Sequence, residues 1–420
     1  MKIFNKTYDN GLRLCLEKND SVVLSLNILF NVGSQNEQEH EQGYSHFIEH
    51  LIFKSSEKYQ TDEINDKLSF YGADFNAYTT RSVTRFTFKC LAENFEPCFE
   101  IYSDILLRSK FEASEIDKER NVVVEEMKKS EDDPTQIMFE RVMQNYYSGL
   151  SFAHDELGKE DVIMTVSREK LLAYKTKYYK PENCIISVAG NIDFDKLDKI
   201  VTKHFSSNFD YKHKPYMVEK TRLKENIETK FDIIERNDNQ ANVCILIKNV
   251  QCYDKAKYIS DIYTMMLGAS QNSRLFNRIR EKLGLVYNIY AMGNVGAQNG
   301  EIFIMFGTRS KNISKAMREI KNVIDDLAIN GTTVEELTRI KNLAKSSLSF
   351  NLETNSDIAE INGSSVHFYE RVLTKDEMLS EIDKVSVEDI NAFAKRIKEE
   401  KSVAVVAVGK GIKQEDIEVF

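Results

Sequence analysis

Residues 166–190 read VSREKLLAYKTKYYKPENCIISVAG, and residues 385–409 read VSVEDINAFAKRIKEEKSVAVVAVG. The two stretches align without a gap at a constant separation of 219 positions, so that Gly190 falls on Gly409. Each copy starts with a serine and a nearby acidic residue, continues with a helical pattern, and ends in an apolar run before the glycine. This order predicts a capped helix, a short loop and a buried β-strand in each half of the chain.

A second correspondence lies upstream of the first. SEIDKERN at 114–121 matches EELTRIKN at 335–342, now with a separation of 221 positions. Two well-separated matches at nearly the same spacing predict an internal duplication. The boundary is expected near 205–225, which gives an N-terminal domain over 1–210 and a homologous C-terminal domain over 220–420.

The first half contains both of the periods that mark regular structure. Residues 21–33 and 81–92 have the β-branched, apolar character of strands, whereas residues 43–55 and 112–133 have apolar side chains at helical spacing. This mixture predicts an α+β fold, with helices laid on one face of a sheet in each domain.

Composition excludes several classes of protein. The chain has 420 residues, of which 42% are apolar and 29% charged, with a net charge of −9 and no basic block that would bind nucleic acid. It has no apolar run of about 18 residues, so we expect no membrane span. The N-terminal MKIFNKTYDNGLRL lacks the apolar core of a secretory signal, and the six cysteines are scattered, with several in apolar runs. We therefore expect reduced, buried thiols and a cytoplasmic location.

The stretch GYSHFIEHLIFKS at residues 43–55 carries the clearest chemical pattern. On a helix, His46 and His50 project from one face, so both imidazoles can reach one metal ion. Glu49 flanks that face and can act as a general base toward a water activated by the metal. The alternative is an amphipathic helix that carries two histidines by chance, and a third protein ligand is needed to favour a catalytic site.

The best source of a third ligand is the segment EIDKERNVVVEEMKKSEDDP. Its Glu119 and Glu126 are seven residues apart and so lie nearly above one another on a helix. Glu126 can serve as the ligand and Glu119 as a hydrogen-bond partner of the site. Glu125 is a rival for the ligand role, and any of these glutamates can instead belong to a solvated helix face.

These residues resemble the M16 metallopeptidases, the family of pitrilysin, insulysin and the mitochondrial processing peptidase, over nearly the whole chain. The H-x-x-E-H order is the inverted zinc-peptidase motif, and ERNVVVEE is similar to the family's second segment, whose register favours Glu126 over Glu125. The resemblance implies one zinc ion per chain held by His46, His50 and Glu126, with Glu119 as supporting acid. It also implies two homologous domains, each a mainly antiparallel sheet with helices packed on it.

Two further segments resemble the family's substrate-binding parts. GADFNAYTTRSVTRF is similar to an edge strand that binds an extended peptide, which implies substrate contacts at Asn76 and Ala77. SRLFNRIREKLGLVYNIYA is similar to the segment that supplies an arginine and a tyrosine seven residues apart, here Arg280 and Tyr287. The resemblance implies that these two bind the substrate carbonyl and stabilise its oxyanion. As isolated residues, all four are unremarkable.

The duplication predicts a single metal site. The second-half counterpart of the zinc helix is expected near LGASQNSRLF, which has no histidine, and the counterpart of Glu126 is about Ser347. The family's His-Pro-Leu-Gly stretch is replaced by FAHDELGKEDVI, which leaves His154 without an assigned role.

The resemblance to short two-domain members implies a pair of chains around a closed chamber, in which one chain's arginine and tyrosine face the other's zinc. We therefore expect a cytoplasmic zinc endopeptidase that cuts unfolded peptides or short polypeptides, most simply as a homodimer. The alternatives are half of a heterodimeric peptide-maturation protease with a degenerate M16 partner, and a non-catalytic scaffold subunit.

Overall fold

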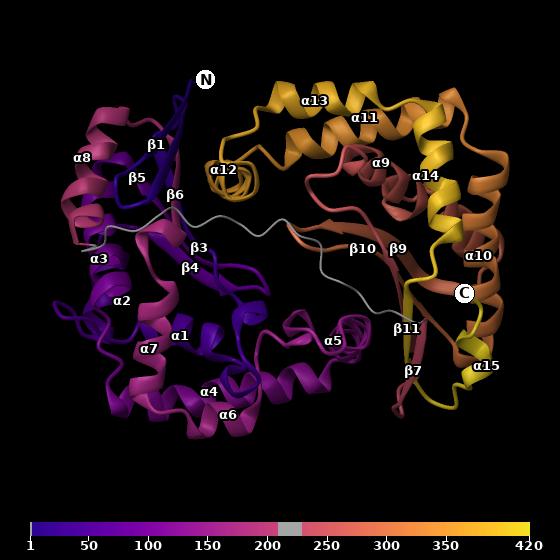
Figure 1. Ribbon diagram of the computed structural model, residues 1–420, viewed down its shortest axis with the longest axis horizontal. Helices are drawn as coiled ribbons and strands as arrows, with labels where there is room; N and C mark the ends of the chain where they lie inside the picture. Colours follow the sequence, from indigo (N-terminus) through magenta and orange to yellow (C-terminus); the bar gives the residue numbers. More distant parts are fainter. Residues whose placement is uncertain (1, 209–228) are drawn as a thin grey trace. The chain divides into compact units, whose positions relative to one another are not determined.

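The computed structural model describes residues 2–208 and 229–420. They form two compact units, each built on one β-sheet, and Figure 1 labels most of the helices and strands. Every sheet is covered by helices, so the predicted α+β class is confirmed.

The first sheet has six strands in the order β1-β2-β6-β3-β5-β4. All neighbouring strands are antiparallel except β2 and β6, which run parallel. The strands are β1 (Lys2–Thr7), β2 (Arg13–Lys18), β3 (Val23–Phe30), β4 (Asp74–Thr79), β5 (Thr84–Leu91) and β6 (Cys184–Gly190). The first repeat copy therefore supplies a central strand, as its apolar run predicts.

The second sheet repeats this plan with five strands in the order β7-β11-β8-β10-β9. Its single parallel pair is β11 with β7, which matches β6 with β2 in the first sheet. The strands are β7 (Lys230–Glu235), β8 (Ala241–Lys248), β9 (Val286–Val295), β10 (Gly300–Thr308) and β11 (Val403–Gly409). The second repeat copy supplies the matching central strand, so the order β7-β11-β8-β10-β9 corresponds to β2-β6-β3-β5-β4 of the first sheet.

Helices cover both sheets. The first unit contains α1 (Tyr44–Ile52), α2 (Thr61–Phe70), α3 (Phe95–Arg108), most of α4 (Ala113–Asp132), α6 (Glu160–Thr165), α7 (Arg168–Tyr178), α8 (Phe194–His204) and α12 (Asn355–Tyr369). The second unit contains α5 (Pro134–Tyr146), α9 (Lys257–Gly268), the π-helix η7 (Phe276–Lys282), α10 (Ile313–Asn330), α11 (Val334–Phe350), α13 (Lys375–Lys384), α14 (Val387–Glu399) and α15 (Gln414–Ile417).

The halves exchange one helix each, a feature that the sequence did not predict. Helix α5 comes from the first half and contacts β11 and β8, whereas α12 comes from the second half and contacts β6, β3 and β2. Both helices occupy the same place in the repeated plan, immediately after α4 and α11. The predicted boundary near 205–225 lies largely outside the described residues, so the division into 1–210 and 220–420 stays a prediction.

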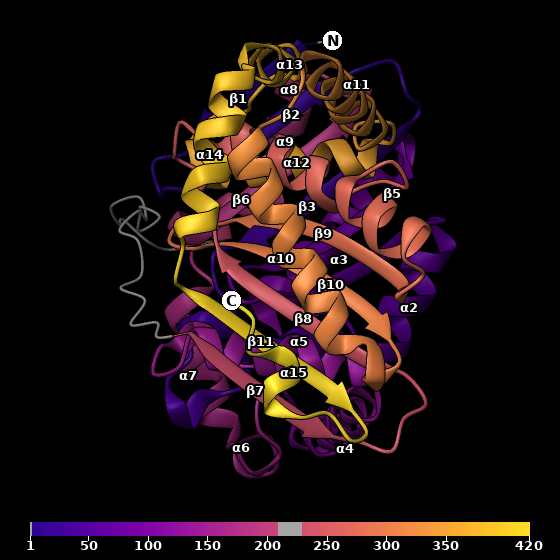
Figure 2. The same cartoon turned by 90° about the vertical axis from the view of Figure 1, so that its right-hand side faces the viewer.

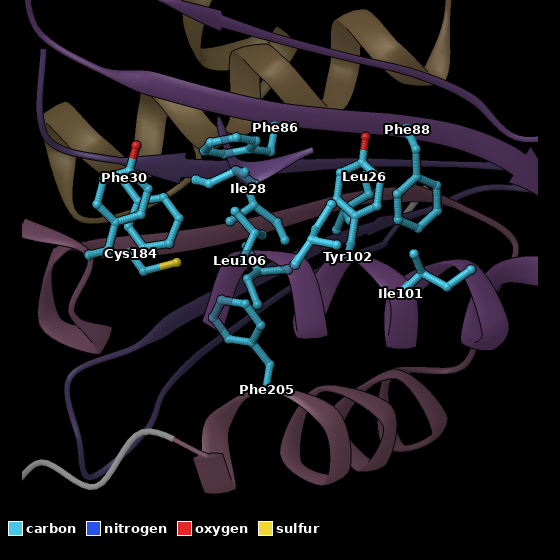
Figure 3. Packing of buried hydrophobic residues seen from close by; sticks show 14 of the residues in the cluster. Leu26, Ile28, Phe30, Phe86, Phe88, Ile101, Tyr102, Leu106, Cys184 and Phe205 are labelled. Carbon is cyan, nitrogen blue, oxygen red and sulfur yellow. The ribbon is translucent and has the colours of Figure 1, made fainter. Parts of the chain in front are cut away.

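One face of the first sheet carries the main core. Figure 3 shows Leu26 and Ile28 of β3 beside Phe86 and Phe88 of β5, over Tyr102 of α3. The Phe88 and Tyr102 rings meet edge to face with centroids 4.8 Å apart, and the Tyr102 hydroxyl donates to the Thr87 carbonyl. This apolar layer fixes α1, which carries His46 and His50, on one side of the sheet.

The second unit has a matching core. In Figure 2, α10 and α14 lie over the second sheet, and their apolar faces join the inward side chains of β8, β10 and β11 in one cluster.

All six cysteines are buried free thiols, as predicted. Within the described residues, no helix has the length and apolar character needed to cross a membrane.

The opposite face of the first sheet is partly polar and is covered by α12. Asn362 donates to the buried carboxylate of Glu17 at 2.9 Å, and Arg85 donates to the Ser364 hydroxyl at 2.7 Å. His367 of the same helix is 3% exposed, and its buried Nδ1 has no hydrogen-bond partner among the described residues. Burial, followed by the charges of Arg13 and Arg85, lowers the pKa of His367 to about 3.

This buried histidine predicts a pH-dependent stability. Below its usual pKa of about 6.5, the unfolded chain protonates His367 and the folded chain does not, so folding loses about 1.4 kcal/mol per pH unit down to about pH 3. Urea unfolding at pH 7, 6 and 5 should show this loss, and His367→Phe should reduce the slope by about that amount. Equal slopes for the two proteins would contradict the assignment.

Candidate metal centre

Helix α1 places the two histidines on its less apolar side. Phe47, Ile48, Leu51 and Ile52 are buried in the first core, which fixes the rotation of the helix. The His46 and His50 rings then lie side by side, with centroids 4.7 Å apart and side chains 14% and 17% exposed. The i, i+4 spacing therefore produces the predicted pair.

Helix α4 brings Glu126 to this pair. A Glu126 carboxylate oxygen lies 3.7 Å from His46 Nε2 and 3.5 Å from His50 Nε2. One ligand atom from each of the three residues lies within 4.8 Å of the others, and this is the only such group among the described residues. Glu125, the rival on helical spacing, instead pairs with Lys128 at the surface.

The donor set fits a tetrahedral zinc ion. With bonds of about 2.0–2.1 Å, the ligand atoms of such an ion are roughly 3.3 Å apart, close to the 3.5 and 3.7 Å observed. Burial, and then the charge of His50, lowers the pKa of His46 to about 3, so its imidazole is neutral at pH 7. A neutral imidazole is the form that binds a metal.

Glu119 orients the His50 ring through its Nδ1 atom. Its carboxylate is 3.1 Å from His50 Nδ1 and 2.8 Å from Lys54 Nζ. Burial raises the pKa of Glu119, but the hydrogen bonds from His50 and Lys54 outweigh it and lower the pKa below its usual value. An ionised carboxylate on Nδ1 leaves Nε2 free to face Glu126, as in carboxylate–histidine–metal arrangements.

Glu49 lies beside this group and is 9% exposed. The Thr79 hydroxyl donates to its Oε2 at 2.7 Å. Burial raises the pKa of Glu49, and the Thr79 hydrogen bond opposes this effect only in part. A carboxylate with a raised pKa is a better proton acceptor at neutral pH than an exposed one.

The predicted substrate strand is β4, at the edge of the first sheet. It pairs only with β5 in the described part of the chain, and its last residue is the Thr79 that contacts Glu49. Asn76 is exposed on this strand and Ala77 is half-buried beside it. The structure thus places both on an edge that leads to the metal-binding group, and their contact with substrate stays a prediction.

Arg280 and Tyr287 lie in the second unit, whereas the metal-binding group lies in the first. Arg280 is on η7 with its guanidinium 4.7 Å from the Phe276 ring centroid. Tyr287 is 49% exposed on β9, the edge strand of the second sheet, and its hydroxyl accepts a hydrogen bond from Arg309. His154 is not a member of the group, and its Nε2 lies 3.7 Å from a Glu39 oxygen.

The helix that takes the place of α1 in the second unit is α9, which lies beside the edge strand β9 as α1 lies beside β4. The spacing of the duplication predicted this counterpart near residues 267–276, about ten positions later than α9. The difference arises because the connection from strand to helix is shorter in the second unit. Neither segment contains a histidine.

Sequence reasoning missed Glu37, which holds the start of α1. Its two carboxylate oxygens accept hydrogen bonds from the backbone N–H groups of Gly43 and Ser45, both at 2.7 Å. Gly43 has φ +96°, and a side chain there would meet the Leu157 carbonyl. Glu37 lies six and eight residues before the amides that it caps, which is not the spacing of a capping box. Gly43 was therefore the only residue in the sequence that indicated the start of this helix.

The fold and this group define a metallopeptidase-like protein, and comparisons with known proteins agree. Residues 13–157 match the family model of Insulinase (Peptidase family M16), and residues 165–344 match that of the Peptidase M16 inactive domain. The chain belongs to peptidase family M16.

Similar proteins come from several bacteria. An uncharacterized zinc protease of Bacillus subtilis, YmxG, is 30% identical, with 93% of this chain and 94% of that protein covered. An uncharacterized zinc protease of Mycobacterium tuberculosis is 25% identical, with 97% and 93% covered. A crystal structure of a protease from Helicobacter pylori superimposes with a TM-score of 0.87 at 21% identity, covering 97% of this chain and 99% of that one, which establishes the shared fold.

The Glu37 contact predicts a loss of stability on substitution. Glu37→Met removes both acceptors and leaves two amides unpaired, at a cost of about 1–3 kcal/mol each. Glu37→Gln retains one acceptor and should lose about half as much. Urea unfolding measures both, with the exposed Glu93→Met as control. A Glu37→Met protein as stable as the control would refute the capping role.

Proposed function

We propose that this chain is a zinc-dependent endopeptidase that cuts unfolded peptides or short polypeptides. The observation that carries the proposal is the convergence of His46, His50 and Glu126 beside the buried Glu49, in a chain of family M16. The relatives whose names include zinc protease support the same metal.

His46, His50 and Glu126 would hold one zinc ion per chain. When bound in such a site, zinc supplies Lewis-acid polarisation of a carbonyl and lowers the pKa of a water molecule to about 7. Glu119 keeps the His50 ring in the orientation that turns Nε2 toward Glu126. The protein's own contribution here is a fixed donor geometry.

Glu49 acts as the general base. It accepts a proton from the attacking water and returns it to the leaving amine when the peptide bond breaks. Thr79 holds one carboxylate oxygen at 2.7 Å, so the other oxygen remains available for the proton. Burial excludes competing solvent from the carboxylate and raises its pKa toward the working range.

The substrate binds as an extended strand along β4. An edge strand offers a row of unpaired backbone groups to a peptide, so recognition depends mainly on backbone with limited side-chain choice. Asn76 and Ala77 lie on this edge. Folded proteins are poor substrates because their strands are already paired.

Arg280 and Tyr287 bind the substrate carbonyl and its oxyanion. In the proposed homodimer they come from the partner chain, and two chains enclose the reaction in a chamber. The proposed compartment is the cytoplasm, where the six buried thiols remain reduced.

The first test removes the base and keeps the metal ligands. Glu49→Gln should retain about one zinc per chain by elemental analysis, and hydrolysis of an internally quenched peptide should fall about 10²–10⁴-fold. Glu125→Gln, on the exposed side of α4, is the matched control and should retain activity. Full activity of Glu49→Gln would refute the base assignment, and wild-type protein without zinc would support a scaffold instead.

The second test asks whether the site is shared between chains. Glu49→Gln and Tyr287→Phe chains, each nearly inactive alone, should regain about a quarter of wild-type activity when mixed, because half of the random dimers have one complete site. Tyr290→Phe, on the same strand, is the control and should stay active. A mixture no more active than the mean of its components would refute a shared site.

A further inference from the structure

The second unit contains a cavity of about 500 Å³ between η7, α10 and α11 that has no part in the proposed reaction. Figure 2 labels α10 and α11, and η7 precedes β9. Nine of its ten lining residues are polar, and four of these are the cations Arg274, Arg278, Lys282 and Arg339. The volume lies in the range of small-molecule sites, which is about 300–1,000 Å³.

The two carboxylates of the cavity are already engaged by one cation. Arg274 donates to Glu336 at 2.7 and 2.9 Å and to Asp326 at 3.0 Å. Arg274 also donates to the Gly331 carbonyl at 2.9 Å. Arg274, Glu336 and Asp326 therefore use their hydrogen-bonding groups on one another.

The other three cations keep free donors. Arg278 uses its Nε to reach Glu319 at 2.8 Å, and its terminal nitrogens have no partner in the described part of the chain. Arg339 makes one hydrogen bond, at 3.3 Å to the Asn272 carbonyl, and no ion pair among the described residues. Lys282 is exposed, and among residues 2–208 and 229–420 it forms no ion pair.

We propose that this cavity binds a phosphate-type oxyanion, with Lys282 and Arg339 as its main charge partners. Guanidinium groups present paired donors that match a tetrahedral oxyanion, and a lysine adds a point charge. Asn272, Asn277 and Asn322 also line the cavity, and an asparagine amide is a neutral donor. A dianion gains more than a monoanion here, because Lys282 and Arg339 form no ion pair with a carboxylate among the described residues.

Binding would also fix η7. This seven-residue π-helix contributes Arg278 and Lys282 to the cavity, and it carries Arg280 on a separate, exposed position. An anion that joins Lys282 to Arg339 ties η7 to α11. π-Helical turns often occur where a protein positions functional groups, so the bound anion stabilises the segment that presents Arg280.

The test measures binding without using catalysis. Inorganic phosphate is titrated into wild-type protein by calorimetry at low ionic strength, with acetate as the monovalent carboxylate probe. Phosphate should bind saturably and more tightly than acetate. The Kd should weaken about tenfold in the Lys282→Ala/Arg339→Ala variant, and less than about twofold in Lys395→Ala, an exposed lysine of α14.

A second readout follows the backbone. Amide hydrogen exchange over residues 276–285 should slow when phosphate binds to wild-type protein, and stay unchanged in the double variant. Because Lys282 and Arg339 are exposed, the variant is expected to fold, and circular dichroism checks this. The proposal is overturned if phosphate does not saturate at up to about 10 mM, if acetate binds equally well, or if the double variant binds as tightly as wild type. Zinc binding and peptide hydrolysis have no part in these outcomes.

Discussion

The site depends on the orientation of one short helix. Four apolar side chains of α1 are buried in the first core, and each contributes about 1.5–3 kcal/mol relative to exposure. Together they fix the rotation of α1, so His46 and His50 can face only α4. Glu37 holds the first turn of the helix, and Glu119 then sets the His50 ring within that face. Rotating α1 by one residue would bury an imidazole and expose a core side chain.

The duplicated scaffold separates folding from chemistry. The five described strands of the second sheet follow the order of β2-β6-β3-β5-β4 in the first, and each sheet has one parallel pair. The second unit has α9, which has no histidine, in the place of α1, and its described residues contain no metal-binding group. Apolar residues recur at matching core positions because both sheets must bury the same faces. Polar residues outside the core can differ between the units without loss of packing. The second unit instead presents β9 and η7, with the exposed Tyr287 and Arg280.

Local patterns in the sequence predicted most of the fold. The repeat at 166–190 and 385–409 identified β6 and β11 with their preceding helices, because an apolar run after a capped helix is a local signal. The exchange of α5 and α12 between the units was not predictable in this way. Each helix has a face that either sheet can bury, so its partner is decided by contacts far away in sequence, such as Asn362 with Glu17, which are 345 positions apart. The Thr79–Glu49 hydrogen bond escaped prediction for the same reason.

The sequence by itself determined the duplication, the α+β class and the pairing of His46 with His50, since each follows from spacing along the chain. Helical spacing alone left Glu125 and Glu126 both open as partners of the histidines. Only the tertiary structure decided that Glu126 faces them and that Glu125 reaches solvent and Lys128. The physical reason is that periodicity specifies which residues share a face of a helix. Periodicity does not specify which face of α1 meets which face of α4. That choice depends on burying the apolar surfaces of α1, α4 and the sheet together.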